Sequence, residues 1–436
     1  PQSEWQSRLL SVGTTLLMSG ALRLLLTRQM LICVFTGFSS GLPLYLLLNL
    51  LPAWLRSDGV DLKTIGFFAL IQFPYTWKFL WSPLLDRYRL PLGRRRGWTL
   101  LSQIGLLLSI GLLGGFSPAS NLTPVIWLSV VLAFLSATQD VALDAFRREI
   151  LSDEELGIGN SVHVNAYRIA GLVPGSLSLI LADLLPWSQV FWITAAFMLP
   201  GMLMVLLVSE PPVLGAPKTL RQAVVEPFHE FIGRKGWRGA LLVLGFIFLY
   251  KLGDSLATAL STPFYLDLGY SKTDIGVIAK HAGLWPAVFG GLLGGLWMVR
   301  LGINRGLWLF GLVQWVTILG FAWLAWRGVQ PVIDGVDRAA LAGVISAEYL
   351  GVGLGTAAFT AFIARATNPA FTATQFALFT SLAAVPRTFI NASAGALVES
   401  LGWVSFFILC FLLAVPGMLL LLKVAPWNET LPSLRR

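Results

Sequence analysis

The sequence predicts an all-α integral membrane protein with twelve transmembrane helices, arranged as two pseudo-symmetric six-helix halves with both termini in the cytoplasm. Three observations support this prediction: the composition, a series of apolar runs and an internal repeat. Of the 436 residues, 56% are hydrophobic and only 12% are charged, whereas soluble domains carry about 25% charged residues. Too few polar side chains remain to cover a water-soluble globule of this size, so lipid must be the main solvent.

The apolar runs are each about long enough to cross a bilayer, which takes about 20 residues of helix. They lie near residues 30–55, 62–84, 98–116, 124–148, 159–184, 187–208, 240–265, 272–298, 304–326, 338–364, 371–398 and 401–422. Strands of a membrane barrel would be about half as long and would alternate in polarity, so a barrel is excluded.

Polar stretches between these runs divide the chain. We expect an N-terminal segment at 1–28, a first six-helix half at 29–208, a cytoplasmic linker at 209–239, a second half at 240–423 and a tail at 424–436. The N-terminal segment mixes leucines with Arg8, Arg23 and Arg28, which predicts an amphipathic helix on the membrane surface or a flexible tail. Every loop is too small for a catalytic domain.

The second half repeats motifs of the first half in the same order. Residues 61–66 (DLKTIG) return as 271–276 (SKTDIG), and residues 199–203 (LPGML) return as 415–419 (VPGML). A looser echo joins Arg96-Gly97-Trp98 to the stretch from Arg305 to Trp308. The offset of about 210–216 residues is shared by all three pairs. Two related halves of membrane-spanning helices are typical of secondary transporters.

A series of basic residues lies in loops that all fall on one side of the predicted membrane. They are Arg87, Arg89, Arg94, Arg95, Arg96, Arg147, Arg148, Lys218, Arg221, Arg234, Lys235, Arg238, Arg300, Arg305, Arg365 and Lys423. The opposite loops near 117–123 and 185–187 contain no Lys or Arg. Cytoplasmic loops carry the excess of Lys and Arg, so this side is predicted to be cytoplasmic. Membrane topology therefore accounts for the net charge of +9, and no nucleic-acid partner is expected.

Asp140, Asp254 and Glu348 are carboxylates that lie well inside predicted spans, away from their ends. Each charge at mid-membrane costs at least about 2.5–3.5 kcal/mol and needs a partner, a cavity or a function. A carboxylate in a poorly hydrated cavity can load and release a proton, so all three are proton-coupling candidates. Glu348 has no obvious partner on its own helix. Asp254 lies three residues from Lys251, and the two could instead form a static pair.

Four charged residues near the cytoplasmic ends are gating candidates: Asp86, Arg87, Asp144 and Arg147. Asp144 lies one helical turn from Asp140, and with Arg147 it fits a latch to the loop between the second and third helices better than a substrate site.

An enzyme is not expected. The three histidines, His163, His229 and His281, are well separated, and the cysteines Cys33 and Cys410 lie inside apolar segments without metal-ligand spacing. We therefore expect no metal and no cofactor, with the proton as coupling ion. His281 fits a packing histidine.

Several strings together resemble the AmpG-type muropeptide permeases of the major facilitator superfamily. The matching stretches are residues 41–44 (GLPL), 61–68 (DLKTIGFF), 78–84 (KFLWSPL), 86–88 (DRY), 93–98 (GRRRGW), 139–140 (QD), 144–145 (DA), 217–220 (PKTL), 250–254 (YKLGD) and 374–378 (TQFAL). Two departures concern the 2–3 loop: Ser82 stands where the superfamily motif has Gly, and several residues separate Arg87 from Gly93.

The resemblance implies an importer in the bacterial inner membrane. Its expected substrate is a disaccharide of N-acetylglucosamine and anhydro-N-acetylmuramic acid, with or without a short peptide. Uptake is expected to be driven by protons and to serve peptidoglycan recycling and β-lactamase induction, with the transporter acting as a monomer in the lipid bilayer. In this fold the first helix of each three-helix unit lines the cavity, which would place Asp140, Asp254 and Glu348 around it.

Such a fragment is amphiphilic and anionic, and it calls for cations, amides and aromatic rings. The substrate-binding candidates are Lys251, Arg168, Arg387, Tyr45, Asn49, Gln72, Gln139, Tyr250 and Trp285, with Gln314 as a further amide. Arg168 and Arg387 could either pair with acidic residues or bind the substrate, and most membrane aromatics are anchors or packing. Competing hypotheses are a facilitator or exporter of another amphiphile and a receptor that binds without transport.

Overall fold

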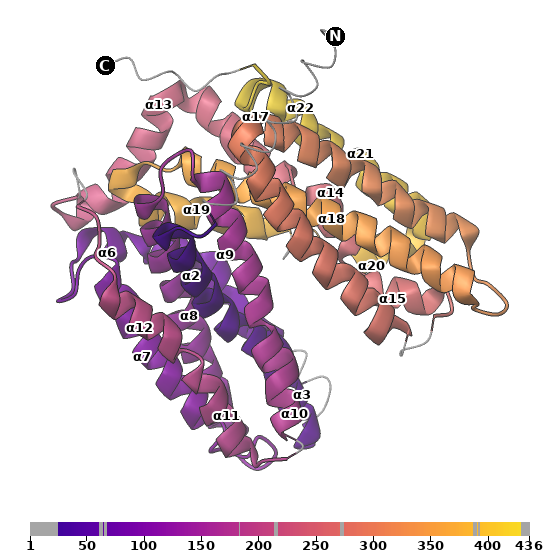
Figure 1. The fold of residues 1–436 in the computed structure, drawn as a ribbon, viewed down its shortest axis with the longest axis horizontal. Coiled ribbons are helices and arrows are strands. Elements are labelled where there is room, and N and C mark those ends of the chain that lie inside the picture. Colours follow the sequence, from indigo (N-terminus) through magenta and orange to yellow (C-terminus); the bar gives the residue numbers. More distant parts are fainter. Residues whose placement is uncertain are drawn as a thin grey trace, which may run out of the picture.

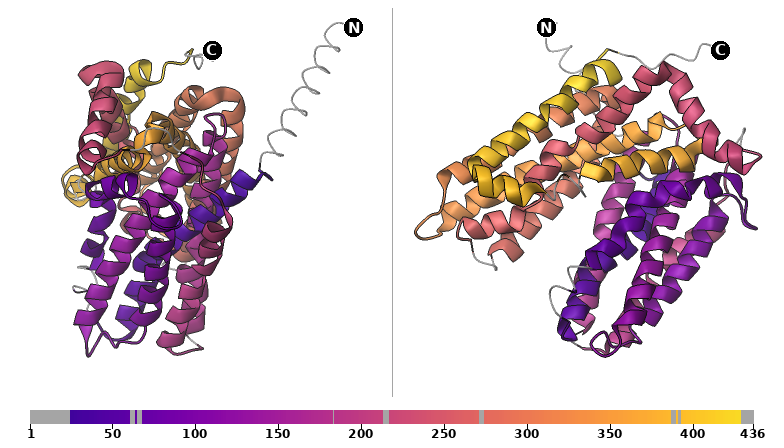
Figure 2. Two further views of the ribbon diagram at one scale, coloured as in Figure 1. Left: turned by 90° about the vertical axis from the view of Figure 1, so that its left-hand side faces the viewer. Right: turned by 180° about the vertical axis from the view of Figure 1, so that it is seen from behind.

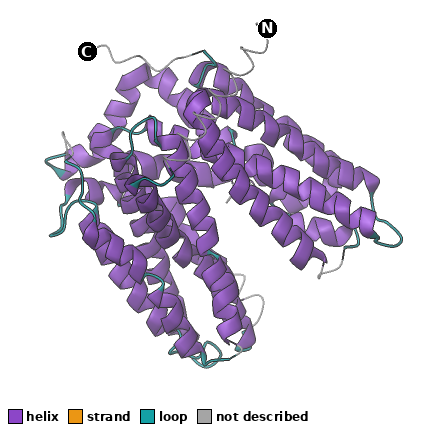
Figure 3. Ribbon diagram, in the orientation of Figure 1, coloured by secondary structure: helices purple, strands orange, loops and turns teal. Residues whose placement is uncertain are grey.

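The computed structural model describes residues 25–60, 64, 68–182, 184–212, 217–270, 274–386, 390 and 393–428. The predicted N-terminal segment up to residue 24, much of the repeated string at 61–66, Arg387 and the last eight residues lie outside the described residues. Within the described ranges the chain is helical and has no strands (Figure 3).

The helices form two bundles that follow one another along the chain (Figure 1). The N-terminal bundle contains α2 (Arg28–Tyr45), η1 (Leu46–Leu50), α3 (Leu51–Ser57), η2 (Phe68–Gln72), α5 (Phe73–Trp77), η3 (Lys78–Leu80), α6 (Ser82–Arg87), α7 (Arg96–Leu113), α8 (Leu122–Ile150), α9 (Leu156–Ala170), η4 (Val173–Leu177), α10 (Ser178–Ala182), α11 (Trp187–Ala196) and α12 (Leu199–Leu207). The C-terminal bundle contains α13 (Leu220–Leu249), α14 (Leu252–Thr258), α15 (Ser261–Asp267), η5 (Ile275–Ala279), α17 (Lys280–Arg327), α18 (Gly335–Ala366), η6 (Pro369–Phe371), α19 (Thr372–Val385), α20 (Ala394–Leu401), α21 (Trp403–Leu413) and α22 (Val415–Val424).

Nine helical runs in the described part of the chain are long and apolar enough to cross a membrane. The longest, Val277–Arg327, is a hairpin, because Gly302 has φ 77° and ψ 168°. The Trp297 and Phe310 rings stack with centroids 6.2 Å apart, although a straight helix would separate these residues by about 20 Å. Only glycine adopts such a positive φ at little cost.

Two of the twelve expected spans, at 62–84 and 371–398, are not among these nine runs, and part of each lies outside the described residues. The run expected at 62–84 is divided into η2, α5, η3 and α6, with Pro74 and Pro83 at the starts of the two α-helices. Of the run expected at 371–398, the structure describes α19, which is followed by Pro386, and α20; residues 387–389, 391 and 392 between them lie outside the described residues. The nine runs are therefore a count of long helices among the described residues and not of membrane crossings.

Large apolar side chains cover the outer surfaces of both bundles. Trp127, Leu203 and Phe289 are more than half exposed, and many Leu, Val and Ile side chains around them are exposed as well. Contiguous apolar surface of this kind is not stable in water, which agrees with lipid as the solvent.

The bundles meet at one end and diverge toward the other (Figures 1 and 2). At the meeting end α9 packs against α17 and α18, and α19 packs against α6 and α8. A buried apolar cluster continues across the junction, from Met30 and Ile158 on one side to Met298 and Phe362 on the other. We call this the basic end, because its hydrogen bonds join residues of the predicted basic loops, such as Arg95, Arg148 and Arg365.

Candidate functional site

The C-terminal bundle contains a closed triangle of polar side chains. Lys251 lies between α13 and α14, and its Nζ is 3.1 Å from Oδ2 of Asp254. The same Nζ donates to Oε1 of Gln314 on α17 at 2.7 Å. Gln314 Nε2 in turn donates to Asp254 Oδ1 at 3.2 Å. The predicted Lys251–Asp254 pair therefore forms, and the amide on another helix completes it.

Glu348 on α18 lies beside this triangle and outside its hydrogen bonds. Its side chain is fully buried, and neither carboxylate oxygen has a hydrogen-bond partner among the described residues. Asp254 and Lys251 are the charged groups that act on it, and the Thr317 hydroxyl lies near its carboxyl group. A buried polar group without a partner is costly, so this carboxyl is the least satisfied member of the cluster.

The N-terminal bundle holds a second polar cluster around Asp140 and Asp144 of α8. Arg147 Nη1 lies 3.0 Å from Asp144 Oδ1, and Lys78 Nζ on η3 lies 4.0 Å from Asp144 Oδ2. Asp140 is buried one turn away, and its Oδ1 has no hydrogen-bond partner among the described residues. Asp144 and Arg147, predicted to be gating residues, are thus joined to each other and to Lys78.

The second cluster extends into α9 and α2 through neutral groups. Arg147 Nε donates to Asn160 Oδ1 at 2.9 Å, and His163 Nε2 lies 3.9 Å from Asp144 Oδ1. The other ring nitrogen of His163 is 2.9 Å from the Thr36 hydroxyl. The carboxylates Asp140 and Glu348 therefore belong to separate clusters in separate bundles.

A pocket of about 490 Å³ lies between the bundles. It is lined by Tyr45, Arg168, Ser261, Tyr265, Ala279, Lys280, Gly283, Leu284, Ala287, Tyr349 and Val352. Arg168 Nη1 donates across the junction to the Ala287 carbonyl at 3.0 Å. Two cations and three tyrosines from both bundles thus face one space, a lining that can bind an anionic solute with ring-shaped apolar faces.

The substrate-binding candidates divide between this pocket, other exposed or half-buried positions and the cores. Tyr45 and Arg168 line the pocket, and Tyr45 packs edge-on against Tyr167 with centroids 5.7 Å apart. Asn49 and Trp285 are exposed, and Gln72 is half-buried. Trp285 Nε1 donates to His281 at 3.2 Å. Arg387 lies outside the described residues.

Gln139 and Tyr250 have partners within their own bundles. Gln139 is fully buried and donates to the Ser39 carbonyl at 2.9 Å. The Tyr250 hydroxyl donates to the Leu307 carbonyl at 2.8 Å, and its ring stacks on Phe359 with centroids 5.5 Å apart. In this conformation both side chains support packing, and neither lines the pocket.

Tyr265, Tyr349 and Lys280 line the pocket although they were not expected there. Tyr265 and Tyr349 resemble many other membrane tyrosines in the sequence, and Lys280 precedes His281 without any motif. The pairing of distant helices α15, α17 and α18 places them together, which sequence spacing does not reveal.

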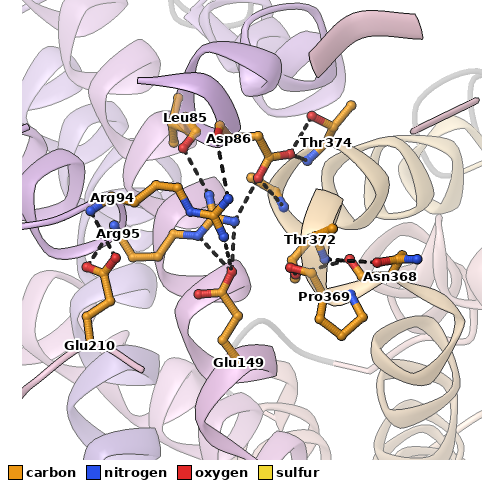
Figure 4. A network of polar contacts seen from close by, with 12 residues as sticks. Leu85, Asp86, Arg94, Arg95, Glu149, Glu210, Asn368, Pro369, Thr372 and Thr374 are labelled. Atoms are coloured by element: carbon orange, nitrogen blue, oxygen red, sulfur yellow. Dashed lines mark hydrogen bonds and ion pairs between the residues drawn. The ribbon is translucent and has the colours of Figure 1, made fainter. Parts of the chain in front are cut away.

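The gating candidate Asp86 joins the two bundles at the basic end (Figure 4). Its Oδ2 accepts hydrogen bonds from the Thr374 backbone N–H at 2.9 Å and from the Thr374 hydroxyl at 2.7 Å. Its Oδ1 accepts from the Ala373 N–H at 3.3 Å. These are first-turn N–H groups of α19, which lack partners within the helix. Asp86 therefore caps a helix of the opposite bundle, where a negative charge is favourable.

Arg95 holds Asp86 in place. Its Nη2 is 2.7 Å from Asp86 Oδ1 and 2.8 Å from Glu149 Oε1, and all three side chains are almost fully buried. Burial acts to lower the pKa of Arg95, but Glu149 and Asp86 outweigh this effect and raise the pKa above its usual value. Arg87, the other gating candidate of this loop, lies over the Tyr88 ring at 5.3 Å instead.

Glu149 and Glu210 complete this network and were not expected from the sequence. Glu210 accepts hydrogen bonds from the N–H groups of Arg94, Arg95 and Arg96 at 2.9, 3.0 and 3.1 Å, so it caps α7. Glu149 is preceded directly by Arg147-Arg148, which would be consistent with local pairing. Its partners Arg94 and Arg95 are instead about 54 residues away in the chain.

Comparisons with known proteins identify the family. The profile of the Major Facilitator Superfamily matches residues 33–390, which is most of the chain. The chain belongs to the Major Facilitator Superfamily. This superfamily member is therefore a multi-pass membrane transporter and not an enzyme, as the sequence predicted.

Relatives and solved structures agree with this assignment. A Haemophilus influenzae protein described as uncharacterized is 52% identical over 92% of this chain and 96% of its own length. The anhydromuropeptide permease of Escherichia coli (strain K12) is 42% identical over 90% of this chain and 78% of its own, so the resemblance to muropeptide permeases is confirmed.

Two solved transporters share the fold. The proton:xylose symporter XylE is 11% identical, with a TM-score of 0.68 over 91% of this chain and 95% of its own. FucP in the outward conformation is 12% identical, with a TM-score of 0.67 over 91% of this chain and 99% of its own. At these identities the likeness concerns the fold alone.

Proposed function

We propose that this transporter imports anhydromuropeptides, disaccharide fragments of the cell wall with or without peptide, from periplasm to cytoplasm in symport with protons. The relationship to the Escherichia coli permease supports the substrate class. The observation that carries the proposal is the pocket between the bundles, where Arg168 and Lys280 accompany three tyrosines. Tyrosine faces suit the two sugar rings, and the cations suit the carboxylates of a lactyl or peptide group.

Proton coupling is assigned to the carboxyl groups Glu348, Asp254 and Asp140, with Glu348 as first choice. The charge of Asp254 is already paired with Lys251, and Gln314 donates a hydrogen bond to it. Glu348 is buried without a hydrogen bond among the described residues. An ionised carboxylate at mid-membrane costs at least about 2.5–3.5 kcal/mol. A carboxyl that binds its proton on one side, is occluded and releases it on the other avoids this cost.

The transport cycle alternates access by rocking of the two bundles. We propose twelve crossings with both termini in the cytoplasm, because the basic loops share one end and such loops are retained inside. In this orientation the end closed by Asp86 and α19 faces the cytoplasm. The bacterial inner membrane as location, a monomer as functional unit and roles in peptidoglycan recycling and β-lactamase induction belong to the same proposal.

The test is uptake of labelled anhydromuropeptide into proteoliposomes, with and without an imposed inward proton gradient. We expect accumulation above equilibrium only with the gradient. If the labelled ligand only equilibrates, with or without the gradient, the protein is a facilitator. The carboxylates would then have structural or substrate-binding roles. Binding of the ligand without uptake would indicate a receptor, and outward movement against the gradient would indicate an exporter.

A further inference from the structure

Arg168 is a cation without an acidic partner inside the junction of the two bundles. Among the described residues it forms no ion pair within 4.0 Å, and its printed hydrogen bond is the one from Nη1 to the Ala287 carbonyl at 3.0 Å. The groups that act on it electrostatically are the hydroxyls of Tyr45 and Tyr349. A largely buried charge with only neutral partners is costly to maintain, so this site favours a ligand that brings a negative charge.

The bond from Arg168 to Ala287 is the last contact of a polar seam between α9 and α17. Residues 161, 165 and 168 share one face of α9, because spacings of four and three residues lie on the same side of a helix. Ser161 donates its hydroxyl to the Gly291 carbonyl. A Cβ atom at Gly291 would lie 2.8 Å from the Asn165 amide. Glycine thus allows α9 to touch the backbone of the opposite bundle.

The seam opens into the pocket at Arg168. Both the donor, Arg168, and the acceptor residue, Ala287, line the 490 Å³ space, so a bound solute can reach the bond between them. Lys280 lies on the same wall and belongs to the same helix as Ala287. A ligand carboxylate can therefore contact cations of both bundles.

We propose that Arg168 is the carboxylate receptor of the substrate, and that its bond to Ala287 ties the bundles together until an anionic substrate replaces it. This inference rests on the proposed function and deepens it by naming the group that recognises the negative charge of the substrate. A guanidinium binds a carboxylate through two charge-assisted hydrogen bonds, which are roughly twice as strong as a neutral one. Binding of the substrate carboxylate thus breaks the bond from Arg168 to Ala287. The conformational change follows because the substrate binds more tightly to the conformation in which this bond is broken.

Arg148 offers a matched control. Its Nε donates to the Ala364 carbonyl of the C-terminal bundle at 2.7 Å, so it too is an arginine bonded to a backbone carbonyl across the junction. It pairs with Asp153 and does not line the pocket. Removing it weakens the junction without removing a group that can contact the substrate.

The experiment compares two ligands and three variants of the full chain. The ligands are anhydromuropeptide with free carboxylates and the same compound with its carboxylates converted to amides. Competition for uptake is measured for the wild type, Arg168→Gln, Arg168→Lys and Arg148→Gln. We expect the wild type to prefer the carboxylate form by roughly tenfold or more, since hydrogen bonds to charged groups contribute about 1.5–3 kcal/mol. Arg168→Gln should reduce the ratio to about one, Arg168→Lys should keep part of it, and Arg148→Gln should keep all of it.

A distance measurement without any ligand tests whether the bond from Arg168 to Ala287 holds the bundles together. Spin labels at Leu184 and Val332, which are 75% and 78% exposed, report the separation of the bundles at the end away from the basic end. In ligand-free protein, Arg168→Gln should shift this distance distribution in the same direction as carboxylate ligand shifts the wild type. An unchanged ligand-free distribution, or a preserved preference for the carboxylate form in Arg168→Gln, would overturn the proposal.

These outcomes separate the inference from the function on which it rests. A wild-type protein that takes up neither ligand would contradict anhydromuropeptide import. The ligand-free distance in Arg168→Gln and Arg148→Gln would still decide whether Arg168 ties the bundles. If the wild type takes up both ligands equally, import is supported, but recognition of the substrate carboxylate by Arg168 is contradicted.

Discussion

At the scale of single residues, the surroundings of Asp254 and Glu348 differ, and this difference underlies their proposed roles. The Asp254 carboxylate meets Lys251 at 3.1 Å and Gln314 at 3.2 Å, so its charge is compensated inside the bundle. Glu348 is equally buried and has no hydrogen bond among the described residues. A compensated charge serves structure or substrate binding, whereas an uncompensated carboxyl is suited to gain and lose a proton.

Replacing Glu348 tests this distinction. We expect Glu348→Gln to abolish gradient-driven accumulation in proteoliposomes while sparing ligand binding and exchange, because the amide keeps the shape but cannot carry a proton. Asp254→Asn and Asp140→Asn are the comparison variants. Full accumulation by each of the three single variants would reject all of them as proton carriers.

Lys251 and Asp254 should behave as a unit in unfolding measurements. Lys251→Met leaves a buried carboxylate unpaired, and breaking such a pair costs about 3–5 kcal/mol. We expect Lys251→Met to lower the thermal unfolding midpoint in detergent, and Lys251→Met combined with Asp254→Asn to recover most of the loss. Additive losses in the double variant would show that the two side chains contribute independently.

At the scale of secondary-structure elements, carboxylates placed at helix starts hold the basic end together. Asp86 at the end of α6 caps α19 of the other bundle, and Glu210 beyond α12 caps α7. Each accepts hydrogen bonds from backbone N–H groups that the helix itself leaves free. The first cap crosses the junction between the bundles and the second stays within one of them, so their loss should have different consequences.

Removing the cap on α19 should destabilise the closed basic end. We expect Asp86→Ala to destabilise the closed basic end by about 3–5 kcal/mol, because Arg95 also loses a buried partner. The thermal unfolding midpoint measures the loss. The control is Asp153→Ala, which removes a 55% exposed partner of Arg148 and should cost less than about 1 kcal/mol. Equal effects of both substitutions would contradict the role of Asp86.

Removing Glu210 should have a smaller and more local effect on stability than removing Asp86. Glu210→Ala removes the acceptor of three N–H groups of α7, and loss of a helix cap costs about 0.5–2 kcal/mol. We expect a lower unfolding midpoint with an unchanged Leu184–Val332 distance, since Glu210 and α7 belong to the same bundle. Glu226→Ala, at an exposed position of α13, is the matched carboxylate control.

At the scale of the whole molecule, the bundles are joined at one end and separate toward the other (Figure 2). Three features form the junction: the buried ionic cap at Asp86, the polar seam between α9 and α17, and the apolar cluster that includes Met30 and Met298. In the proposed cycle, rocking about the pocket exchanges these contacts for others at the opposite end.

This geometry predicts opposite changes at the two ends. Asp86→Ala weakens contacts at the basic end, so we expect a shorter Leu184–Val332 distance as the opposite end closes. Spin-label distance distributions in nanodiscs measure the change. A longer or unchanged distance in Asp86→Ala would argue against rocking as a rigid unit.

The sequence by itself determined the helical membrane fold and the family, and it predicted that the basic loops gather at one end. These properties depend on composition, run length and motifs, which are local or periodic along the chain. It also identified Lys251–Asp254 as a pair, because residues three apart on a helix must be neighbours. It also predicted spans at 62–84 and 371–398, of which the structure describes η2, α5, η3 and α6 in the first and α19 and α20 in the second.

Only the tertiary structure decided which distant residues meet. It placed Gln139 and Tyr250 inside the cores, brought Tyr265, Tyr349 and Lys280 to the pocket, and joined Asp86 to Thr374. It also showed that Arg168 meets a carbonyl and not an acidic side chain. The physical reason is that these contacts join different helices, 57 residues apart for Tyr250 and Leu307 and 288 apart for Asp86 and Thr374. The relative rotation and depth of such helices follow from their packing and leave no periodic signal in the chain.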